Sequence, residues 1–532
     1  MKYYILLLIS GLLVWSCHGQ KGLLQKDEDT NELIDINTIK INMNFLASDE
    51  LQGRETGTNS ELVASLFIAS ELEKYGVQPF FGADGYFQNI KLRQILFSDQ
   101  SGFTLVENNQ KKIKDYQYGT DFVCTSGYYP SFDTTAALVF AGYGITAEEY
   151  GYDDYRDIDV QGKIVLLLGG EPESDDSTYF DGKKLTHYAI PTNKLANAVE
   201  HGAIGFMRSS VWEARYGWES IRNYVKKGKY ILGNQKIENR AGQIPEIVIS
   251  DSTLKNLLGY GDKSYSEIQE GLREGKPMPV FELPLQAQVN WQFDTTRTVN
   301  ARNVLGVIEG NDPLLKKEYV GLGAHFDHEG VGPEGVYNGA DDDASGTVAL
   351  LGVAKAFAKI RNNRRSIFIA FHTGEEKGLL GSKYLTSETT VIDSMIAHIN
   401  MDMVGCGSAD SIYSIGSDKL SHEFRQLVES VNTNSVKMNL NYRFDDPGDT
   451  QRFYYRSDHY NYAKRNIPIV FFFDYQMDNY HRVTDDVDKI NFRKIQKIAR
   501  LSFEIARAAA NRENRFILDE GNEQPEPAEM TN

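Results

Sequence analysis

Cysteine is scarce in this chain, which has only Cys17, Cys124 and Cys406 among its 532 residues. Because Cys17 ends an N-terminal apolar run, two cysteines remain for the folded protein. Two cysteines cannot build a disulfide framework, and whether Cys124 and Cys406 form one bridge stays open. No Cys-x-x-Cys spacing occurs, which excludes a thiolate zinc cluster. A metal site in this protein must therefore use histidine and carboxylate ligands.

Positive charge is also in short supply. The chain has 56 Lys and Arg against 74 Asp and Glu, a formal net charge of -18 at pH 7. Nucleic-acid phosphates repel such a protein, so we expect no nucleic-acid partner. A hydrophobic fraction of 41% and a charged fraction of 24% are ordinary for a soluble globular protein. The length allows more than one domain.

The N-terminal apolar run, residues 5–15, is too short to span a bilayer and is typical of a signal-peptide core. Ser16 and Cys17 follow this run directly, an arrangement that resembles a bacterial lipoprotein signal. A plain secretory signal cleaved near Gly19 is the alternative. We expect residues 1–17 to be a signal peptide and residues 18–34 a polar tether. The mature protein is then exported to the cell envelope. It is lipid-anchored at Cys17 to a bacterial membrane, in the periplasm or at the cell surface, or is otherwise secreted.

The composition of the chain changes twice after the tether. Residues 35–125 begin with helical patterns and are predicted to form the first part of a larger domain. Residues 126–290 contain short β-rich runs separated by Gly, Asp and Pro. They lack the acid/base and metal-ligand groups found later, so we expect an inserted β-rich domain that acts as a spacer or lid. The polar tail, residues 516–532, is predicted to be disordered.

Between residues 291 and 515 apolar strand-like runs alternate with helices. The predicted strands are 319–324, 365–371, 395–401 and 467–473, and the predicted helices are 346–360 and 492–511. Strands in near-continuous apolar runs that alternate with helices indicate a mostly parallel mixed sheet with helices on both faces. The predicted fold class is therefore α/β, with a β-rich insert.

Polar groups able to bind metal or move protons follow each of these four strands. His325 and Asp327 follow the first strand, the pair Glu375 and Glu376 follows the second, Asp402 follows the third, and Tyr480-His481 lies beyond the fourth. In open α/β sheets ligands bind at the carboxyl ends of the strands, so these groups are expected to converge. The triple aspartate 341–343 fits the same interpretation, because crowded carboxylates repel one another unless a multivalent cation is bound.

These motifs together resemble the M28-type zinc peptidase family, the cocatalytic dizinc aminopeptidases and their relatives. The motifs that carry the resemblance are Gly-Ala-His325-Phe-Asp327, Asp342-Asp-Ala-Ser-Gly346, Gly-Glu375-Glu376-Lys-Gly, Asn400-Met-Asp402 and Tyr480-His481, with support from Arg456-Ser-Asp-His-Tyr460 and Asp49-Glu-Leu-Gln-Gly-Arg-Glu-Thr-Gly57. The resemblance implies a zinc-exopeptidase fold of the phosphorylase/hydrolase-like type. It also implies that the insert is a protease-associated (PA) domain.

The resemblance further implies a ligand set. His325 and Asp402 bind one metal ion, Glu376 and His481 bind the other, and Asp342 bridges both. This set suits two Zn²⁺ ions and tolerates Co²⁺ or Mn²⁺.

Three further residues receive catalytic roles from the resemblance. Glu375 is the general base, Asp327 orients His325 through its other ring nitrogen, and Tyr480 donates a hydrogen bond to the developing oxyanion. Four residues nearby receive no such role: His328 and His372 are expected to be structural, His459 to lie behind the ligands or to pack, and Asp341 has no assigned ligand role.

The predicted function is an exported dizinc aminopeptidase that hydrolyses the N-terminal residue of peptides with a free N-terminus. A carboxypeptidase or dipeptidase of the same family and a glutaminyl-cyclase-like aminoacyltransferase are the enzymatic alternatives. The third hypothesis is a non-catalytic binding protein on the same scaffold. Retention of all five ligands and of Glu375 counts against it.

Overall fold

The computed structural model describes residues 28–81, 85–125, 131–236, 244–274, 276–446, 449 and 451–519. The predicted signal peptide, the predicted lipidation site Cys17 and most of the predicted disordered tail lie outside these residues. Two described segments fall within stretches predicted to be tether or tail. Helix α1 (Glu28–Leu33) lies inside the predicted tether, and Phe516 packs against Phe424, with the ring centroids 5.0 Å apart.

The described residues form two large sheets that share β13, and the larger one carries the C-terminal half of the chain. Its central strands run in the order β17, β14, β18 and β21 (Ser366–His372, Tyr319–His325, Met395–Met401 and Ile469–Phe473) and are all parallel. Antiparallel strands extend both sides: β13 (Val280–Ile308), β2 (Phe87–Phe97) and β1 (Gln78–Pro79) beyond β17, and β19 (Ser411–Ile415) beyond β21. The short strand β20 (Asn439–Asn441) pairs with β19. The mixed α/β fold class is therefore confirmed.

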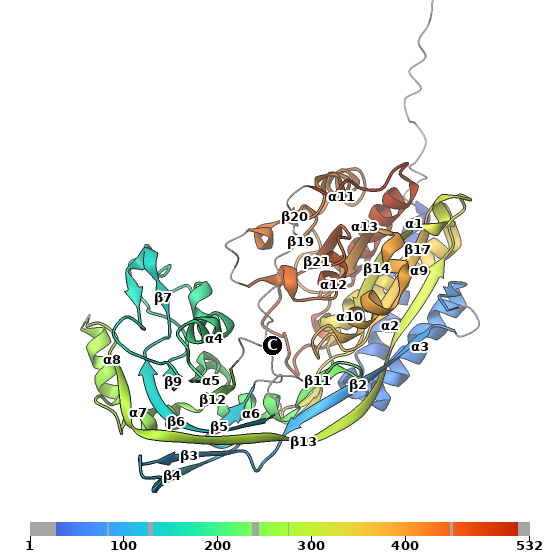
Figure 1. The fold of residues 1–532 in the computed structure, drawn as a ribbon. Coiled ribbons are helices and arrows are strands. Elements are labelled where there is room, and N and C mark those ends of the chain that lie inside the picture. Colours follow the sequence, from blue (N-terminus) through green and yellow to red (C-terminus); the bar gives the residue numbers. More distant parts are fainter. Residues whose placement is uncertain are drawn as a thin grey trace, which may run out of the picture.

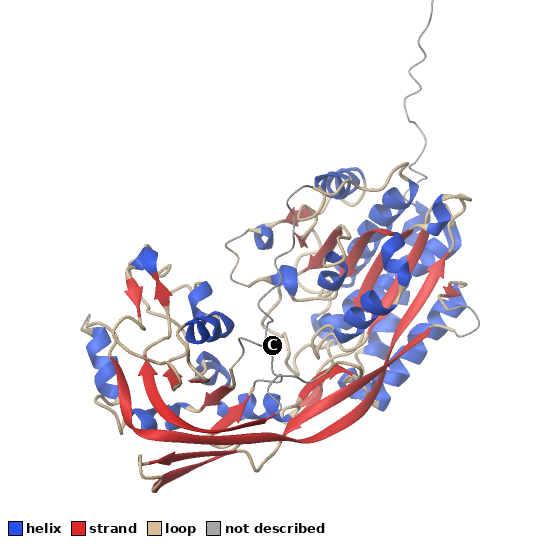
Figure 2. Ribbon diagram, viewed as in Figure 1, coloured by secondary structure: helices blue, strands red, loops and turns tan. Residues whose placement is uncertain are grey.

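Helices cover both faces of this sheet (Figures 1 and 2). On one face α9 (Gly346–Ile360) and α13 (Phe492–Asn511) contact the central strands, with α2 (Ile36–Leu46), α3 (Asn59–Tyr75) and α11 (His422–Asn434) packed beside them. On the other face lie α10 (Leu380–Glu388) and α12 (His459–Ala463). All residues of β17 and β18 are buried, which explains why both strands are continuous apolar runs.

One strand joins the two halves of the molecule. The 29 residues of β13 form a ribbon along the lower edge of Figure 1, and only the C-terminal part pairs within the larger sheet. Its first part pairs with β6 (Ser131–Ala141) and β3 (Gly102–Val106) of a second sheet. That sheet also contains β4 (Lys112–Gln117), β5 (Phe122–Cys124), β9 (Ile164–Leu167), β10 (Gly205–Arg208) and β12 (Glu246–Ile249).

We call the chain from β3 to the first part of β13 the insert. It begins before residue 126, the boundary expected from the sequence, because β3, β4 and β5 belong to its sheet. Its helices are α4 (Pro191–Glu200), α5 (Val211–Tyr216), α6 (Trp218–Lys226), α7 (Asp251–Leu258) and α8 (Tyr265–Arg273). The insert also returns one strand, β11 (Lys229–Leu232), to the larger sheet, where it pairs antiparallel with β2.

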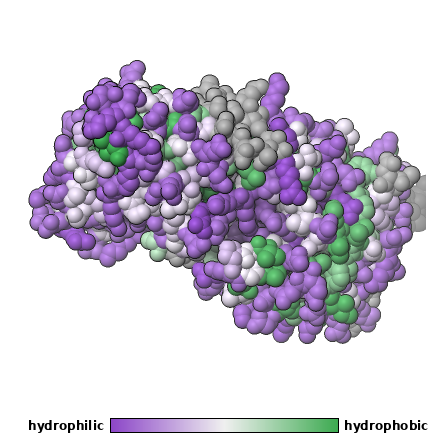
Figure 3. Space-filling model, turned by 90° about the horizontal axis from the view of Figure 1, so that it is seen from below, coloured by the Kyte–Doolittle hydropathy of each residue, from purple (hydrophilic) through white to green (hydrophobic). Residues whose placement is uncertain are grey.

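The surface seen from below is largely hydrophilic, with apolar side chains gathered over the half that holds the larger sheet (Figure 3). Within the described ranges, no helix is long and apolar enough to cross a membrane. Cys124 and Cys406 are both buried and both free, so the bridge left open by the sequence is not formed.

Candidate metal centre

The parallel strands β14, β17 and β18 end at the same edge of the larger sheet, and the predicted ligands lie there. His325 is the last residue of β14, and Asp402 follows the last residue of β18. Glu375 and Glu376 lie in the loop after β17, and Asp342 lies in the turn before α9. The convergence expected from the strand ends is therefore what the structure shows.

The first ligand group contains His325, Asp342 and Asp402. The Nε2 atom of His325 lies 3.2 Å from Oδ1 of Asp342 and 3.4 Å from Oδ1 of Asp402. The ligand atoms of the three residues all lie within 4.8 Å of one another, and the three side chains are buried. This is the spacing that one shared cation would require.

The second group uses the other oxygen of the same aspartate. The Nε2 atom of His481 lies 3.3 Å from Oδ2 of Asp342 and 3.0 Å from Oε2 of Glu376. Asp342 therefore directs Oδ1 toward His325 and Oδ2 toward His481. A carboxylate placed in this way can bridge two metal ions.

His328 is a member of the second group that the sequence analysis assigned to a structural role. It is fully buried, and its Nδ1 atom lies 2.7 Å from Oε1 of Glu376 and 3.8 Å from Oδ2 of Asp342. His328, Asp342 and Glu376 also have their ligand atoms within 4.8 Å of one another. The sequence carried one hint: His328 stands directly after Asp327, in the same loop as His325.

The donor set fits a pair of divalent cations. Within the described part of the chain, several buried ligand atoms make no hydrogen bond: Nε2 of His325, Oδ2 of Asp342, Oε1 of Glu376 and Nε2 of His481. Buried polar atoms without partners are costly, and a cation that accepts their lone pairs would remove the cost. Imidazoles with carboxylates and no thiolate are a donor set for Zn²⁺.

The two histidines are held in a strongly acidic surrounding. Burial alone would lower the pKa of His325, but the carboxylates of Asp402 and Glu375 raise it well above the usual range. At His481 burial also acts to lower the pKa, but Glu376 and then Tyr480 raise it well above the usual range. A cation must therefore compete with protons for these imidazoles.

This competition predicts a pH-dependent stability after metal removal. A histidine whose pKa is raised on folding stabilises the fold below its unfolded pKa, about 6.5, and the stabilisation is lost as pH rises toward the folded pKa. We therefore expect the Tm of chelated protein to fall as pH is raised from 6 to 9, and that of zinc-loaded protein to fall less. Thermal scans of both forms across this range measure the effect; parallel curves would contradict it.

Asp327 lies beside His325 and contacts two neighbouring loops. The Nδ1 atom of His325 lies 3.1 Å from the carbonyl oxygen of Asp327 and 3.7 Å from its Oδ1. The carboxylate accepts hydrogen bonds from the hydroxyl of Thr56 at 2.7 Å and the amide of Glu375 at 3.2 Å. The backbone carbonyl of Asp327 is thus nearer to the ring of His325 than the carboxylate of Asp327 is. The carboxylate instead holds the loop of Glu375.

Glu375 and Tyr480 line a small cavity of about 30 Å³ beside the ligands. Its other lining residues are Asp342, Asp402, Met403, Phe453, Arg456, Phe471 and Phe473. Oε2 of Glu375 lies 4.0 Å from Nε2 of His325, a member of the first ligand group. Burial raises the pKa of Tyr480, which keeps the phenol protonated and able to donate a hydrogen bond.

The three consecutive aspartates, residues 341–343, contact different parts of the centre. The carboxylate of Asp343 accepts from the amides of His325, Gly346 and Met403, at 3.2, 2.8 and 3.1 Å, and so joins β14, α9 and the segment after β18. Asp341 accepts from the amide of Gly405 at 2.7 Å. Asp341, to which the sequence assigned no ligand role, thus holds the chain after Asp402 in place.

Arg54, from the glycine-rich loop before α3, holds the ligand loops in place. Its buried guanidinium donates to the carbonyl oxygens of Phe326, Asn338 and Gly339 at 2.8, 2.7 and 2.9 Å. It joins the loop after β14 to the turn that contains Asp342. The N-terminal part of the chain therefore shapes the centre without supplying a ligand.

His372 and His459 lie outside both ligand groups. The ring of His372 contacts the hydroxyl of Tyr462 at 3.1 Å, and Nε2 of His459 lies 2.8 Å from the carbonyl oxygen of Tyr454. Behind Asp402, the hydroxyl of Ser457 donates to its Oδ2 at 2.6 Å. Ser457 belongs to the Arg-Ser-Asp-His motif, but the motif alone does not show that it contacts Asp402.

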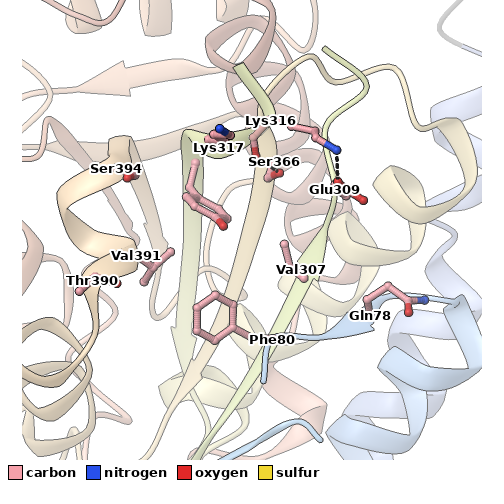
Figure 4. A pocket seen from close by; sticks show the side chains of 11 residues that line it. Gln78, Phe80, Val307, Glu309, Lys316, Lys317, Ser366, Thr390, Val391 and Ser394 are labelled. Atoms are coloured by element: carbon pink, nitrogen blue, oxygen red, sulfur yellow. Dashed lines mark hydrogen bonds and ion pairs between the residues drawn. The ribbon is translucent and has the colours of Figure 1, made fainter. Parts of the chain in front are cut away.

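A larger cavity, about 520 Å³, lies elsewhere and contains none of these residues (Figure 4). It borders the first residues of β14 and β17, at the opposite ends of the strands from the ligands, where Tyr319, Ser366 and Phe80 line it. It has no part in the centre described above.

The part of the chain that holds the centre matches known protein families. Residues 303–506 match the family model described as peptidase family M28. A probable leucine aminopeptidase of Trichophyton verrucosum is 28% identical over 200 residues, which are 36% of this chain and 53% of that protein. A probable zinc metalloprotease of Pyrenophora tritici-repentis is 29% identical over 194 residues, 35% of this chain and 43% of that protein. The chain thus spans about half the length of the curated relatives it matches.

Two solved structures are similar over most of their length. The aminopeptidase from Aneurinibacillus sp. strain AM-1 has a TM-score of 0.55 at 18% identity, covering 93% of this chain and 98% of that one. BSAP, a zinc aminopeptidase from Bacillus subtilis, has a TM-score of 0.51 at 17% identity, covering 90% of this chain and 96% of that one. At this identity the likeness shows the fold. Residues 303–506, which contain the converging ligands, are the part of this chain that matches peptidase family M28.

Proposed function

We propose that the protein is an exported dizinc aminopeptidase that removes N-terminal residues from peptides. The observation that carries the proposal is the placement of Asp342, whose two carboxylate oxygens face two different histidines. His325 and Asp402 would hold one ion, and Glu376 and His481 the other. His328, which contacts Glu376, would be either a further ligand of that second ion or a support for Glu376.

Bound divalent ions supply Lewis acidity toward the scissile carbonyl and toward the attacking water. Glu375, which lines the cavity beside Asp342 and Asp402, takes the proton of that water and later delivers it to the leaving amine. Its burial raises its pKa well above the usual range, which suits a group that carries a proton between the two steps. Tyr480 donates a hydrogen bond to the oxyanion.

The residues that line the cavity favour an exopeptidase that prefers apolar side chains in its substrate. Phe453, Phe471 and Phe473 face it together with Met403, and Arg456 is the one cation among its lining residues. The curated relatives include proteins named probable leucine aminopeptidase, which supports a peptide with a free N-terminus as the substrate class. Export, lipid anchoring at Cys17 and a PA-type identity of the insert complete the proposal, on the support of the sequence patterns.

Peptides with a free, an acetylated or a pyroglutamyl N-terminus test this function, each with and without a C-terminal amide. We expect release of the first residue, leucine included, only when the amine is free, with little effect of the amide. A chelator should abolish the activity and zinc should restore it. Undiminished cleavage of acetylated peptides would remove the aminopeptidase assignment, and dependence on a free carboxylate would favour a carboxypeptidase. Cyclisation of N-terminal glutamine would favour the aminoacyltransferase.

A further inference from the structure

A lysine of the insert reaches the edge of the metal centre. Lys227 lies between α6 and β11, and its Nζ atom is 2.5 Å from Oε2 of Glu329 and 2.9 Å from the carbonyl oxygen of the same residue. In Figure 1, α6 and β11 lie where the insert meets the larger sheet. The insert is therefore in direct ionic contact with the loop that carries His328.

Lys227 is a fixed residue rather than a mobile surface lysine. The side chain of Gln94 in β2 donates to the carbonyl oxygen of Lys227 at 2.7 Å. The next residue, Gly228, has φ of +73°, and a Cβ there would lie 2.5 Å from the carbonyl oxygen of Ile95. Only glycine fits this close turn, so the pairing of β11 with β2 sets the position of Lys227.

Glu329 is a carboxylate within reach of the second ligand group. A ligand atom of Glu329 lies within 4.8 Å of ligand atoms of both Glu376 and His481. Its side chain is only 11% exposed, so it has little access to water. A carboxylate at this distance could enter the coordination sphere of an ion held by Glu376 and His481.

Two lysines instead engage Glu329 on opposite oxygens. Lys227 pairs with Oε2, and the Nζ atom of Lys377 lies 3.8 Å from Oε1. Lys377 directly follows Glu376 and also faces Glu55 at 3.6 Å. Catalytic metal sites keep one coordination position open for water or substrate, and an additional carboxylate would close it.

We propose that Lys227 is a positioning residue that, through Glu329, keeps the coordination position of the second metal ion open. The insert thereby takes part in the metal centre without supplying a ligand. This inference rests on the proposed function only in that Glu376 and His481 bind a cation.

The test compares Lys227→Met with Lys226→Met, a matched control that removes the same charge one residue away on α6 and has an exposed side chain. Zinc titration of the chelated protein by calorimetry and steady-state kinetics on a free-amine peptide are both measured. We expect Lys227→Met to bind the second zinc about tenfold more tightly and to lose about tenfold in kcat, with KM little changed. Lys226→Met should match the wild type in both.

A second variant separates this role from simple loss of charge or structure. In Lys227→Met/Glu329→Gln the competing carboxylate is gone, so kcat and zinc affinity should return toward wild type. Lys227→Arg should retain both. Weaker zinc binding in Lys227→Met, a kcat like that of Lys226→Met, or a defect that Glu329→Gln does not relieve would each overturn the proposal. If wild-type protein binds two zinc ions but cleaves no peptide, the proposed function fails while the zinc titrations still decide the inference.

Discussion

Glu375→Gln is expected to lower kcat by about 10²–10⁴-fold while zinc content stays at the wild-type level. Glu375 lines the cavity beside the ligands, and its carboxylate belongs to neither ligand group. Glutamine has nearly the same shape but cannot accept the proton of the attacking water. Its main-chain amide can still donate to Asp327, as that of Glu375 does at 3.2 Å, so the loop should keep its place.

The measurement combines kinetics with metal analysis of the same preparations. Glu334→Gln is the matched control, because Glu334 is exposed in the loop between β15 (Gly330–Gly332) and β16 (Gly335–Tyr337) and undergoes the same chemical change. It should retain wild-type kcat. A Glu375→Gln enzyme that turns over at the wild-type rate would assign the proton transfer to another group. A loss of zinc in this variant would instead make Glu375 a ligand.

The C-terminal part of the fold could be predicted closely because local patterns decide it. The helices predicted at 346–360 and 492–511 and the strand at 395–401 have the same bounds in the structure. Fully buried parallel strands are continuous apolar runs, and a long helix with one apolar face shows its period in the sequence. Since ligands gather at strand ends, the position of the centre followed from the same patterns.

What could not be predicted depends on contacts between distant segments. His328 has no local feature that separates a ligand from a packed histidine; its buried contact with Glu376 exists only once β14 and β17 are adjacent. The pairing of Lys227 with Glu329 joins residues 102 positions apart. Strand β3 joins the sheet of the insert by pairing with β13, far along the chain, and β4 pairs with β3; no local pattern in the sequence shows these pairings.

Asp342→Asn should remove more metal than any terminal ligand change. The aspartate contributes to both ligand groups, whereas Asp402 contributes to one. Asparagine retains one oxygen but offers a neutral NH₂ group in place of the second, so it cannot bridge two cations. We expect Asp342→Asn to lose both ions at micromolar zinc and to be inactive, and Asp402→Asn to keep close to one ion, held by Glu376 and His481.

Metal analysis after equilibrium dialysis against graded zinc measures the difference, and thermal scans confirm that each variant is folded. Asp342 is buried with its amide bonded to Asp485 at 3.1 Å, a contact that asparagine preserves, so loss of metal need not mean loss of fold. Equal zinc content in Asp342→Asn and Asp402→Asn would mean that Asp342 serves only one ion. The centre would then be two separate sites rather than one bridged pair, and the roles of His325 and His481 would have to be assigned independently.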